Sequence, residues 1–225
     1  MKKMILLLPL FLFLQSCENG VDNEVDDEEP YVNWEKGVHN GYEWVNLDLS
    51  VKWATSNLGA NSPEEYGGYF AWGETTPKLI FSFNDYTYFD AVDVGFLYYN
   101  LPKNRDAATV NMGGSWRIPT DNEIKELRAK CGWKWTNDYK GTGAAGYIVT
   151  SRSNGNHIFL PAAGCHNGNR WKYIGVFGSY WSSTLRTMSE AYDISFASDY
   201  VDEYDSSDRY EGRSVRGVIP RWVYN

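Results

Sequence analysis

The stretch Gly113-Gly114-Ser115-Trp116-Arg117-Ile118-Pro119-Thr120 joins the two segments of the chain that most clearly predict helices. Thr120 and Glu123 form a capping box, so a helix is expected to begin there and to end at Gly132. Its apolar positions at helical spacing are Ile124, Leu127 and Cys131. On the other side of the stretch, Asp106 is expected to begin a shorter helix that ends before the glycine pair.

Short β-prone runs between clusters of Gly, Asn, Asp and Ser fill most of the remaining chain. One of them, Tyr192–Phe196, alternates apolar and polar residues with the period of two that is typical of a half-buried strand. The expected strands are Tyr42–Leu47, Val51–Ala54, Tyr69–Trp72, Tyr147–Ser151, His157–Pro161, Tyr180–Thr184, Tyr192–Phe196 and Arg213–Ile219. The sequence therefore predicts an α+β domain with short twisted antiparallel strands, two helices and long loops.

Several large or charged side chains stand beside glycines or apolar residues and are expected to hold this domain together. The tryptophans assigned to the core are Trp53, Trp72, Trp116 and Trp181. Close backbone approach is expected at Gly113-Gly114 and at Gly164. The arginines expected to connect strands to carboxylates or carbonyls are Arg117, Arg213 and Arg216.

A series of motifs in fixed order carries a resemblance to a known family. They are Val51-Lys52-Trp53-Ala54-Thr55, Gly59-Ala60, Tyr69-Phe70-Ala71-Trp72-Gly73-Glu74, Asp106-Ala107-Ala108, the Gly113–Thr120 stretch, Phe159-Leu160-Pro161-Ala162-Ala163-Gly164, Tyr180-Trp181-Ser182-Ser183 and Arg213-Ser214-Val215-Arg216. From about Gly41 to Ile219, the chain resembles the Fibrobacter succinogenes major paralogous domain, which is common in Bacteroidota surface lipoproteins.

The resemblance implies a C-type-lectin-like fold with a face of long loops that binds ligands. The same fold group contains formylglycine-generating enzymes and the variable proteins of diversity-generating retroelements. This chain departs from those relatives in two respects. It lacks the lectin-type calcium triplets, and it has no counterpart of the paired catalytic cysteines.

Residues 1–17 predict export and lipid anchoring. Lys2 and Lys3 precede an apolar run from Met4 to Leu14, which is too short to cross a bilayer but suits a secretory signal. Cys17 directly follows Ser16, as in a bacterial lipoprotein box, so Cys17 is the expected lipidation site. Stable attachment to a membrane requires two or more acyl chains. We expect a protein at the outer membrane or cell surface.

Most of the negative charge lies in the segment after this cysteine. The chain has a formal charge of −8, and residues 18–30 carry seven acidic side chains and no basic ones. We expect residues 18–38 to form a disordered acidic tether, either a plain spacer or a surface-export signal, before a domain at 39–225. The nearly neutral domain offers no basic surface for phosphates, so nucleic acid is not an expected partner.

Tyrosines and acidic residues alternate near the carboxyl end, on a stretch too polar for a core strand. Tyrosine offers a broad contact surface at low entropic cost, and carboxylates accept hydrogen bonds from hydroxyl-rich ligands. A second aromatic loop spans residues 166–177. The candidate ligand-binding residues are Trp171, Tyr173, Arg186, Asp199, Tyr200, Asp202, Tyr204 and Tyr210.

Other motifs favour structural roles. Residues 141–146 match a dinucleotide fingerprint as a string, but no helix follows them, so a flexible hairpin loop is expected. The aspartates at 199, 202, 205 and 208 could offer oxygens to calcium, but a solvated acidic loop is favoured, and neither metal nor cofactor is expected. Ser182, Ser183 and Glu74 lack catalytic partners in the sequence. Cys131 and Cys165 could form a disulfide or remain buried thiols.

These observations predict a membrane-anchored, non-catalytic module that recognises a glycan or a protein. Two alternatives remain. The first is an enzyme, either a cysteine-dependent oxidase related to the formylglycine-generating enzymes or a hydrolase that uses Glu74. The second is a structural component of a surface assembly.

Overall fold

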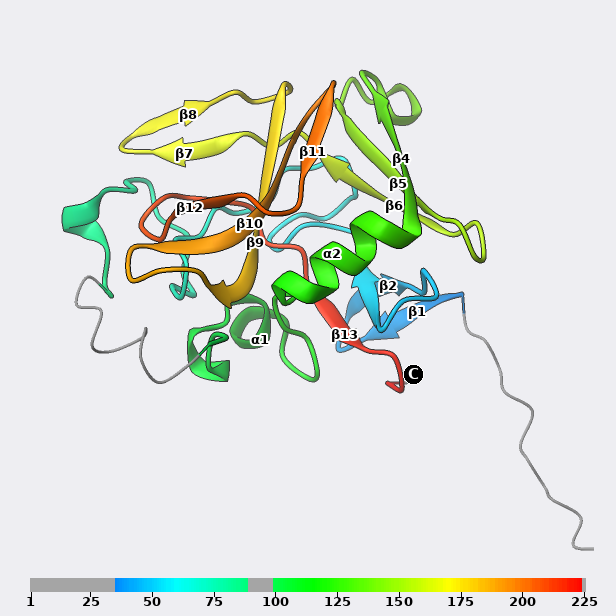
Figure 1. The fold of residues 1–225 in the computed structure, drawn as a ribbon, viewed down its shortest axis with the longest axis horizontal. Helices are drawn as coiled ribbons and strands as arrows, with labels where there is room; N and C mark the ends of the chain where they lie inside the picture. The colour runs from blue at the N-terminus through cyan, green and yellow to red at the C-terminus, as the bar shows by residue number, and fades with distance from the viewer. Residues whose placement is uncertain (1–34, 89–98, 224–225) are drawn as a thin grey trace, which may run out of the picture. The chain divides into compact units, whose positions relative to one another are not determined.

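The computed structural model describes residues 35–88 and 99–223, which form antiparallel sheets and two α-helices joined by long irregular segments (Figure 1). The expected signal, Cys17 and most of the expected tether lie outside these residues. The first strand begins at Lys36, so the folded unit starts before the expected boundary at residue 39.

The elements are short. The strands are β1 (Lys36–His39), β2 (Tyr42–Val45), β3 (Val51–Ala54), β4 (Cys131–Thr136), β5 (Gly146–Ser151), β6 (His157–Pro161), β7 (Cys165–Asn167), β8 (Arg170–Lys172), β9 (Phe177–Leu185), β10 (Glu190–Ala197), β11 (Tyr200–Asp202), β12 (Ser206–Asp208) and β13 (Val218–Pro220). The α-helices are α1 (Ala107–Met112) and α2 (Asp121–Lys130), and the 3₁₀ turns are η1 (Phe83–Asp85), η3 (Lys103–Arg105) and η4 (Tyr139–Gly141).

The sheets are antiparallel throughout. One sheet has the order β1-β2-β3-β13, which pairs an early strand with the last one. A second sheet centres on β10, which pairs with β9, β11 and β12. A third has the order β4-β5-β6, and β7 and β8 form a hairpin of their own. This mixed, mostly antiparallel architecture with few helices is an α+β fold, as the sequence predicts.

Both expected helices form, and the capping box does so as predicted. The Thr120 hydroxyl accepts a hydrogen bond from the Glu123 amide, and the Glu123 carboxylate accepts one from the Thr120 amide at 2.8 Å. At the shorter helix, the Asp106 carboxylate caps the Thr109 amide at 2.8 Å. The predicted end of α2 is wrong, because the helix ends at Lys130 and Gly132 lies within β4.

Some expected strands are shorter or absent. The segment Tyr69–Trp72 forms only an isolated bridge between Phe70 and Arg213, because its amides donate to irregular backbone around Arg209 and Arg213. Of the expected strand Arg213–Ile219, only the end joins β13. Conversely, the polar stretch 199–208 is not a loop but contributes β11 and β12.

The four predicted core tryptophans are all buried. Two of them connect distant segments through their indole N–H groups. Trp72 donates to the Ser182 carbonyl at 2.9 Å, and Trp181 donates to the Phe70 carbonyl at 2.7 Å. These two hydrogen bonds connect the irregular segment 69–72 to β9. They take the place of the strand pairing that was expected for residues 69–72.

The glycine and arginine predictions are also confirmed. Gly164 has φ +67°, and a Cβ there would collide with the Lys172 carbonyl. Gly114 has φ +57°, and its Cβ would collide with His39. Each arginine pairs with carboxylates or polar oxygens. Arg117 contacts the nearby Glu123 carboxylate and Ile118 carbonyl. Arg213 contacts Ser207, Asp193 and Glu211, and Arg216 contacts Asn57 and three backbone carbonyls in distant segments.

Candidate functional site

The eight predicted ligand-binding residues do not form one site. Those from the late segment divide between the two ends of β10, because β11 pairs with Ser195–Ala197 and β12 pairs with Glu190–Tyr192. At about 3.4 Å per residue, these ends lie roughly 20 Å apart. The remaining two residues, Trp171 and Tyr173, lie on and beside β8.

One group lies around β11, close to helix α2. Tyr200 and Tyr204 are exposed, and Tyr204 stacks against Lys125 of α2 with 4.7 Å between the ammonium and the ring centre. Asp199 and Asp202 are exposed as well. The carboxylate of Asp202 accepts a hydrogen bond from the Tyr204 amide at 2.9 Å, so it shapes the turn after β11.

The other end of β10 holds Arg186 and Tyr210, each engaged within the fold. The Arg186 guanidinium donates to the Glu190 carboxylate at 3.0 Å and to the Ser206 hydroxyl at 2.5 Å. The Tyr210 hydroxyl donates to the Asp208 carboxylate at 2.9 Å. These contacts stabilise the β9–β10 turn and β12, so Arg186 and Tyr210 each have a local structural role.

The most distinctive exposed surface is the aromatic patch, which we define as Trp171, Tyr173, Ile174 and Val176. Trp171 exposes 54% of its surface and Tyr173 65%. Tyr173 has φ +61°, an uncommon conformation for a residue with a side chain. The backbone of the patch is fixed, because the amides of Val176 and Phe177 both donate to the Tyr173 carbonyl.

The indole of Trp171 is held in place despite its exposure. The ring of Tyr69 meets it edge to face with 4.7 Å between ring centres, and the ring of His166 meets it at 5.1 Å. Both supports are themselves anchored, since the Tyr69 hydroxyl donates to the Ala163 carbonyl and the His166 amide donates to the Gly212 carbonyl at 2.9 Å. Burial lowers the pKa of His166, which favours a neutral ring beneath the tryptophan.

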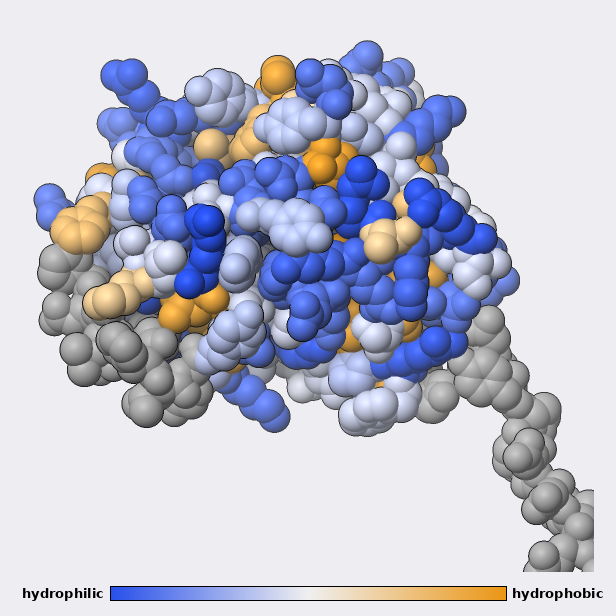
Figure 2. Space-filling view, in the orientation of Figure 1, coloured by the Kyte–Doolittle hydropathy of each residue, from blue (hydrophilic) through white to orange (hydrophobic). Residues whose placement is uncertain are grey.

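The face shown in Figure 2 is mostly hydrophilic, with hydrophobic residues standing out singly or in small groups. An exposed aromatic that is rigidly supported therefore differs from its surroundings, and such residues supply much of the binding energy in protein interfaces.

Two residues considered for catalysis, Glu74 and Ser182, use their side chains within the fold. The carboxylate of Glu74 pairs with Lys78 at 2.7 Å and accepts a hydrogen bond from the Thr87 amide at 2.8 Å. Ser182 is buried, and its hydroxyl accepts a hydrogen bond from the Thr184 amide. Cys131 and Cys165 are both buried and unpaired, and burial raises the pKa of the Cys131 thiol to about 11.

Two further observations concern metals and membranes. In the part of the chain that the structure describes, no three His, Cys, Asp or Glu side chains lie close enough together to hold a metal ion. Neither of the α-helices described has the length and apolar composition needed to cross a bilayer.

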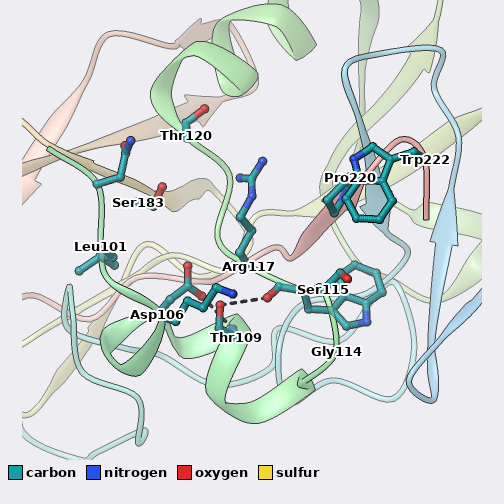
Figure 3. A pocket seen from close by; sticks show the side chains of 13 residues that line it. Leu101, Asp106, Thr109, Gly114, Ser115, Arg117, Thr120, Ser183, Pro220 and Trp222 are labelled. Atoms are coloured by element: carbon teal, nitrogen blue, oxygen red, sulfur yellow. Dashed lines mark hydrogen bonds between the residues drawn. The ribbon is translucent and has the colours of Figure 1, made fainter. Parts of the chain in front are cut away.

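The structure also reveals a pocket that sequence reasoning missed. It has a volume of about 520 Å³ and lies against the Gly113–Thr120 stretch, with Trp222 and Pro220 on one wall (Figure 3). The sequence identified Arg117 as a bridging residue but contained no signal that would bring Trp222 or Ser183 beside it. The bridge between Arg117 and Val218 brings the last strand to this stretch, and the Ser183 amide donates to the Pro119 carbonyl at 2.7 Å.

Comparison with known proteins does not identify relatives. No family model, curated protein or solved structure matches this chain.

Proposed function

We propose that this chain is a lipid-anchored protein of the outer membrane or cell surface that recognises an extracellular ligand without transforming it. The ligand is a glycan or a protein, and the aromatic patch meets it. The observation that carries this proposal is the exposed indole of Trp171, which is held edge to face by two anchored rings. A preorganised aromatic loses little entropy on binding, so its contact area contributes efficiently to affinity.

The body of the protein takes a C-type-lectin-like fold in this proposal. Support comes from the antiparallel sheets, the two helices and the pairing of an early strand with the last one. The motif order that resembles the Fibrobacter succinogenes major paralogous domain supports the same fold. Cys17 provides the anchor, and the acidic tether separates the domain from the membrane.

A binding screen tests the proposal. The full chain is applied to an array of purified glycans and extracellular proteins, beside the double variant Trp171→Ala/Tyr173→Ala. We expect the strongest signal to fall by at least about tenfold in the double variant, because truncating two central aromatics typically costs more than about 2 kcal/mol. Both residues are exposed, so the fold should survive the change.

Matched variants locate the binding face. Tyr99→Ala removes an exposed aromatic side chain that belongs to neither proposed site and should leave the signal intact. Tyr200→Ala/Tyr204→Ala tests the second predicted group. Binding that survives loss of the patch but disappears with the tyrosine pair would move the site to β11. Capture of the chain by itself, seen as concentration-dependent light scattering, would favour a surface assembly instead.

A further inference from the structure

We propose that the pocket beside the Gly113–Thr120 stretch is a second binding site, and that it takes a short acidic saccharide containing a hexuronate. This site lies apart from the aromatic patch and does not depend on it. At about 520 Å³, it falls within the range of small-ligand sites and can hold one or two sugar residues.

Polar atoms without protein partners converge on this pocket. Three are donors only: the ammonium of Lys103, the Nε of Arg117 and the side-chain amide nitrogen of Asn100. The other two are the hydroxyls of Ser115 and Ser183. Each of the five residues lines the pocket, and none of these atoms makes a hydrogen bond within residues 35–88 and 99–223. None of the five is a fully buried atom, so they face the open pocket and are available to a ligand.

The balance of donors favours an anionic ligand that is rich in acceptors. Lysine ammonium and arginine guanidinium groups only donate, and hydroxyls can do either. The Arg117 guanidinium is held rigidly by the Glu123 carboxylate at 2.7 and 2.5 Å, which fixes the position of Nε. Lys103 is exposed and forms no ion pair in the part of the chain that the structure describes, so its charge is free to meet a carboxylate.

The acidic residue in the pocket does not oppose this charge. Asp106 is buried, and its two carboxylate oxygens accept hydrogen bonds from the amides of Thr109 and Ile118 at 2.8 to 3.1 Å. Its oxygens are therefore committed to the backbone beneath the pocket. Burial also raises the pKa of Asp106, which weakens its negative charge further.

The opposite wall suits the apolar face of a sugar ring. Figure 3 shows Arg117 in the middle of the pocket, with Ser183 on one side and Pro220 and Trp222 on the other. The indole of Trp222 is 70% exposed, so its flat surface is open to a ligand. A pyranose ring presents C–H groups on one face and hydroxyls at its edge, which matches an aromatic wall facing hydroxyls and cations.

The test is calorimetric titration of the full chain with the dimer of D-galacturonic acid, with the neutral dimer of D-galactose as comparison. We expect the acidic dimer to bind at least about tenfold more tightly than the neutral one, as one charge-assisted contact would provide. Trp222→Ala and Lys103→Ala should each weaken the acidic dimer by about tenfold. Both side chains are exposed, so both variants should fold.

Matched controls separate this site from the aromatic patch. Lys134→Ala removes an exposed lysine from β4, and Trp171→Ala removes an exposed tryptophan from the patch. Neither should alter the titration. The inference is overturned if the acidic dimer does not bind, if the neutral dimer binds equally well, or if binding survives both pocket variants. Loss of this binding in Trp171→Ala alone would assign the saccharide to the patch and would also overturn the second site.

Discussion

Replacement of Arg216 by leucine tests how the interior of this domain is held together. Arg216 is only 1% exposed, and no carboxylate among the described residues pairs with it. Its guanidinium instead donates to four oxygens at 2.7 to 3.0 Å. They are the side-chain oxygen of Asn57 and the backbone carbonyls of Ala54, Thr55 and Phe159.

The magnitude can be worked out from these four acceptors. Each buried polar group left unpaired costs about 1–3 kcal/mol, so leucine would leave a total penalty of roughly 4–12 kcal/mol. Against this, leucine removes the several kcal/mol spent on desolvating a buried charge. Burial lowers the pKa of Arg216 to about 10, which reflects that desolvation. We therefore expect Arg216→Leu to lower the free energy of unfolding by about 3–5 kcal/mol.

The assay is urea unfolding at pH 7, followed by tryptophan fluorescence. Arg186→Leu is the matched control, because Arg186 is exposed and should change the free energy of unfolding by less than about 1 kcal/mol. Arg216→Lys keeps the charge but has three donors for four acceptors, so it should also lose stability. A loss below about 1 kcal/mol for Arg216→Leu would refute the assignment of Arg216 as the main connection between these segments.

Three further predictions concern pH, backbone geometry and anchoring. Burial raises the pKa of Asp193 to about 6, above the value near 3.9 of an unfolded chain, so its contribution to stability is full below about pH 4 and declines as the pH rises to 6. Between pH 4 and pH 7 in urea titrations, the free energy of unfolding of Asp193→Asn should therefore rise by roughly 2–3 kcal/mol relative to that of the native chain. A difference between the two chains that does not change with pH would contradict this. Gly164→Ala should destabilise the fold by at least about 1 kcal/mol more than Gly143→Ala in the same assay. Both glycines have positive φ, but only at Gly164 would the added Cβ collide with a carbonyl. Equal losses of stability in the two variants would disprove the collision. Cys17→Ser should move the protein from the membrane fraction to the soluble fraction on immunoblots, and retention in the membrane fraction would rule out lipid anchoring through this residue.

Local signals in the sequence predict where α2 begins but not where it ends. Thr120 and Glu123 are three residues apart, and their reciprocal hydrogen bonds form wherever the helix packs. Gly132 is usually a stop signal, but here the chain passes directly from the helix into β4. The alternation of Trp133 and Trp135 around Lys134 is a strand signal that outweighs the glycine.

The candidate sites depend on contacts between distant segments, which one sequence does not reveal. Tyr204 and Tyr210 are six residues apart, but strand pairing sends their neighbourhoods to opposite ends of β10. Trp171 is rigid because Tyr69, about a hundred residues earlier in the chain, packs against it. The pocket beside the Gly113–Thr120 stretch likewise combines Arg117 with Ser183 and Trp222, which lie far apart in the sequence. Composition could indicate that aromatics matter, but only tertiary structure selects which of them are exposed and fixed.

The most direct test of ligand recognition by a preorganised aromatic is fluorine NMR of the full chain labelled with 5-fluorotryptophan. The Trp171 signal is assigned by its disappearance in Trp171→Phe, and the chain is then titrated with the strongest partner from the array. We predict a single sharp Trp171 signal in the free protein that shifts or broadens on binding, while the Trp222 signal stays in place. A Trp171 signal that does not respond while the partner binds would contradict the proposed role of the aromatic patch.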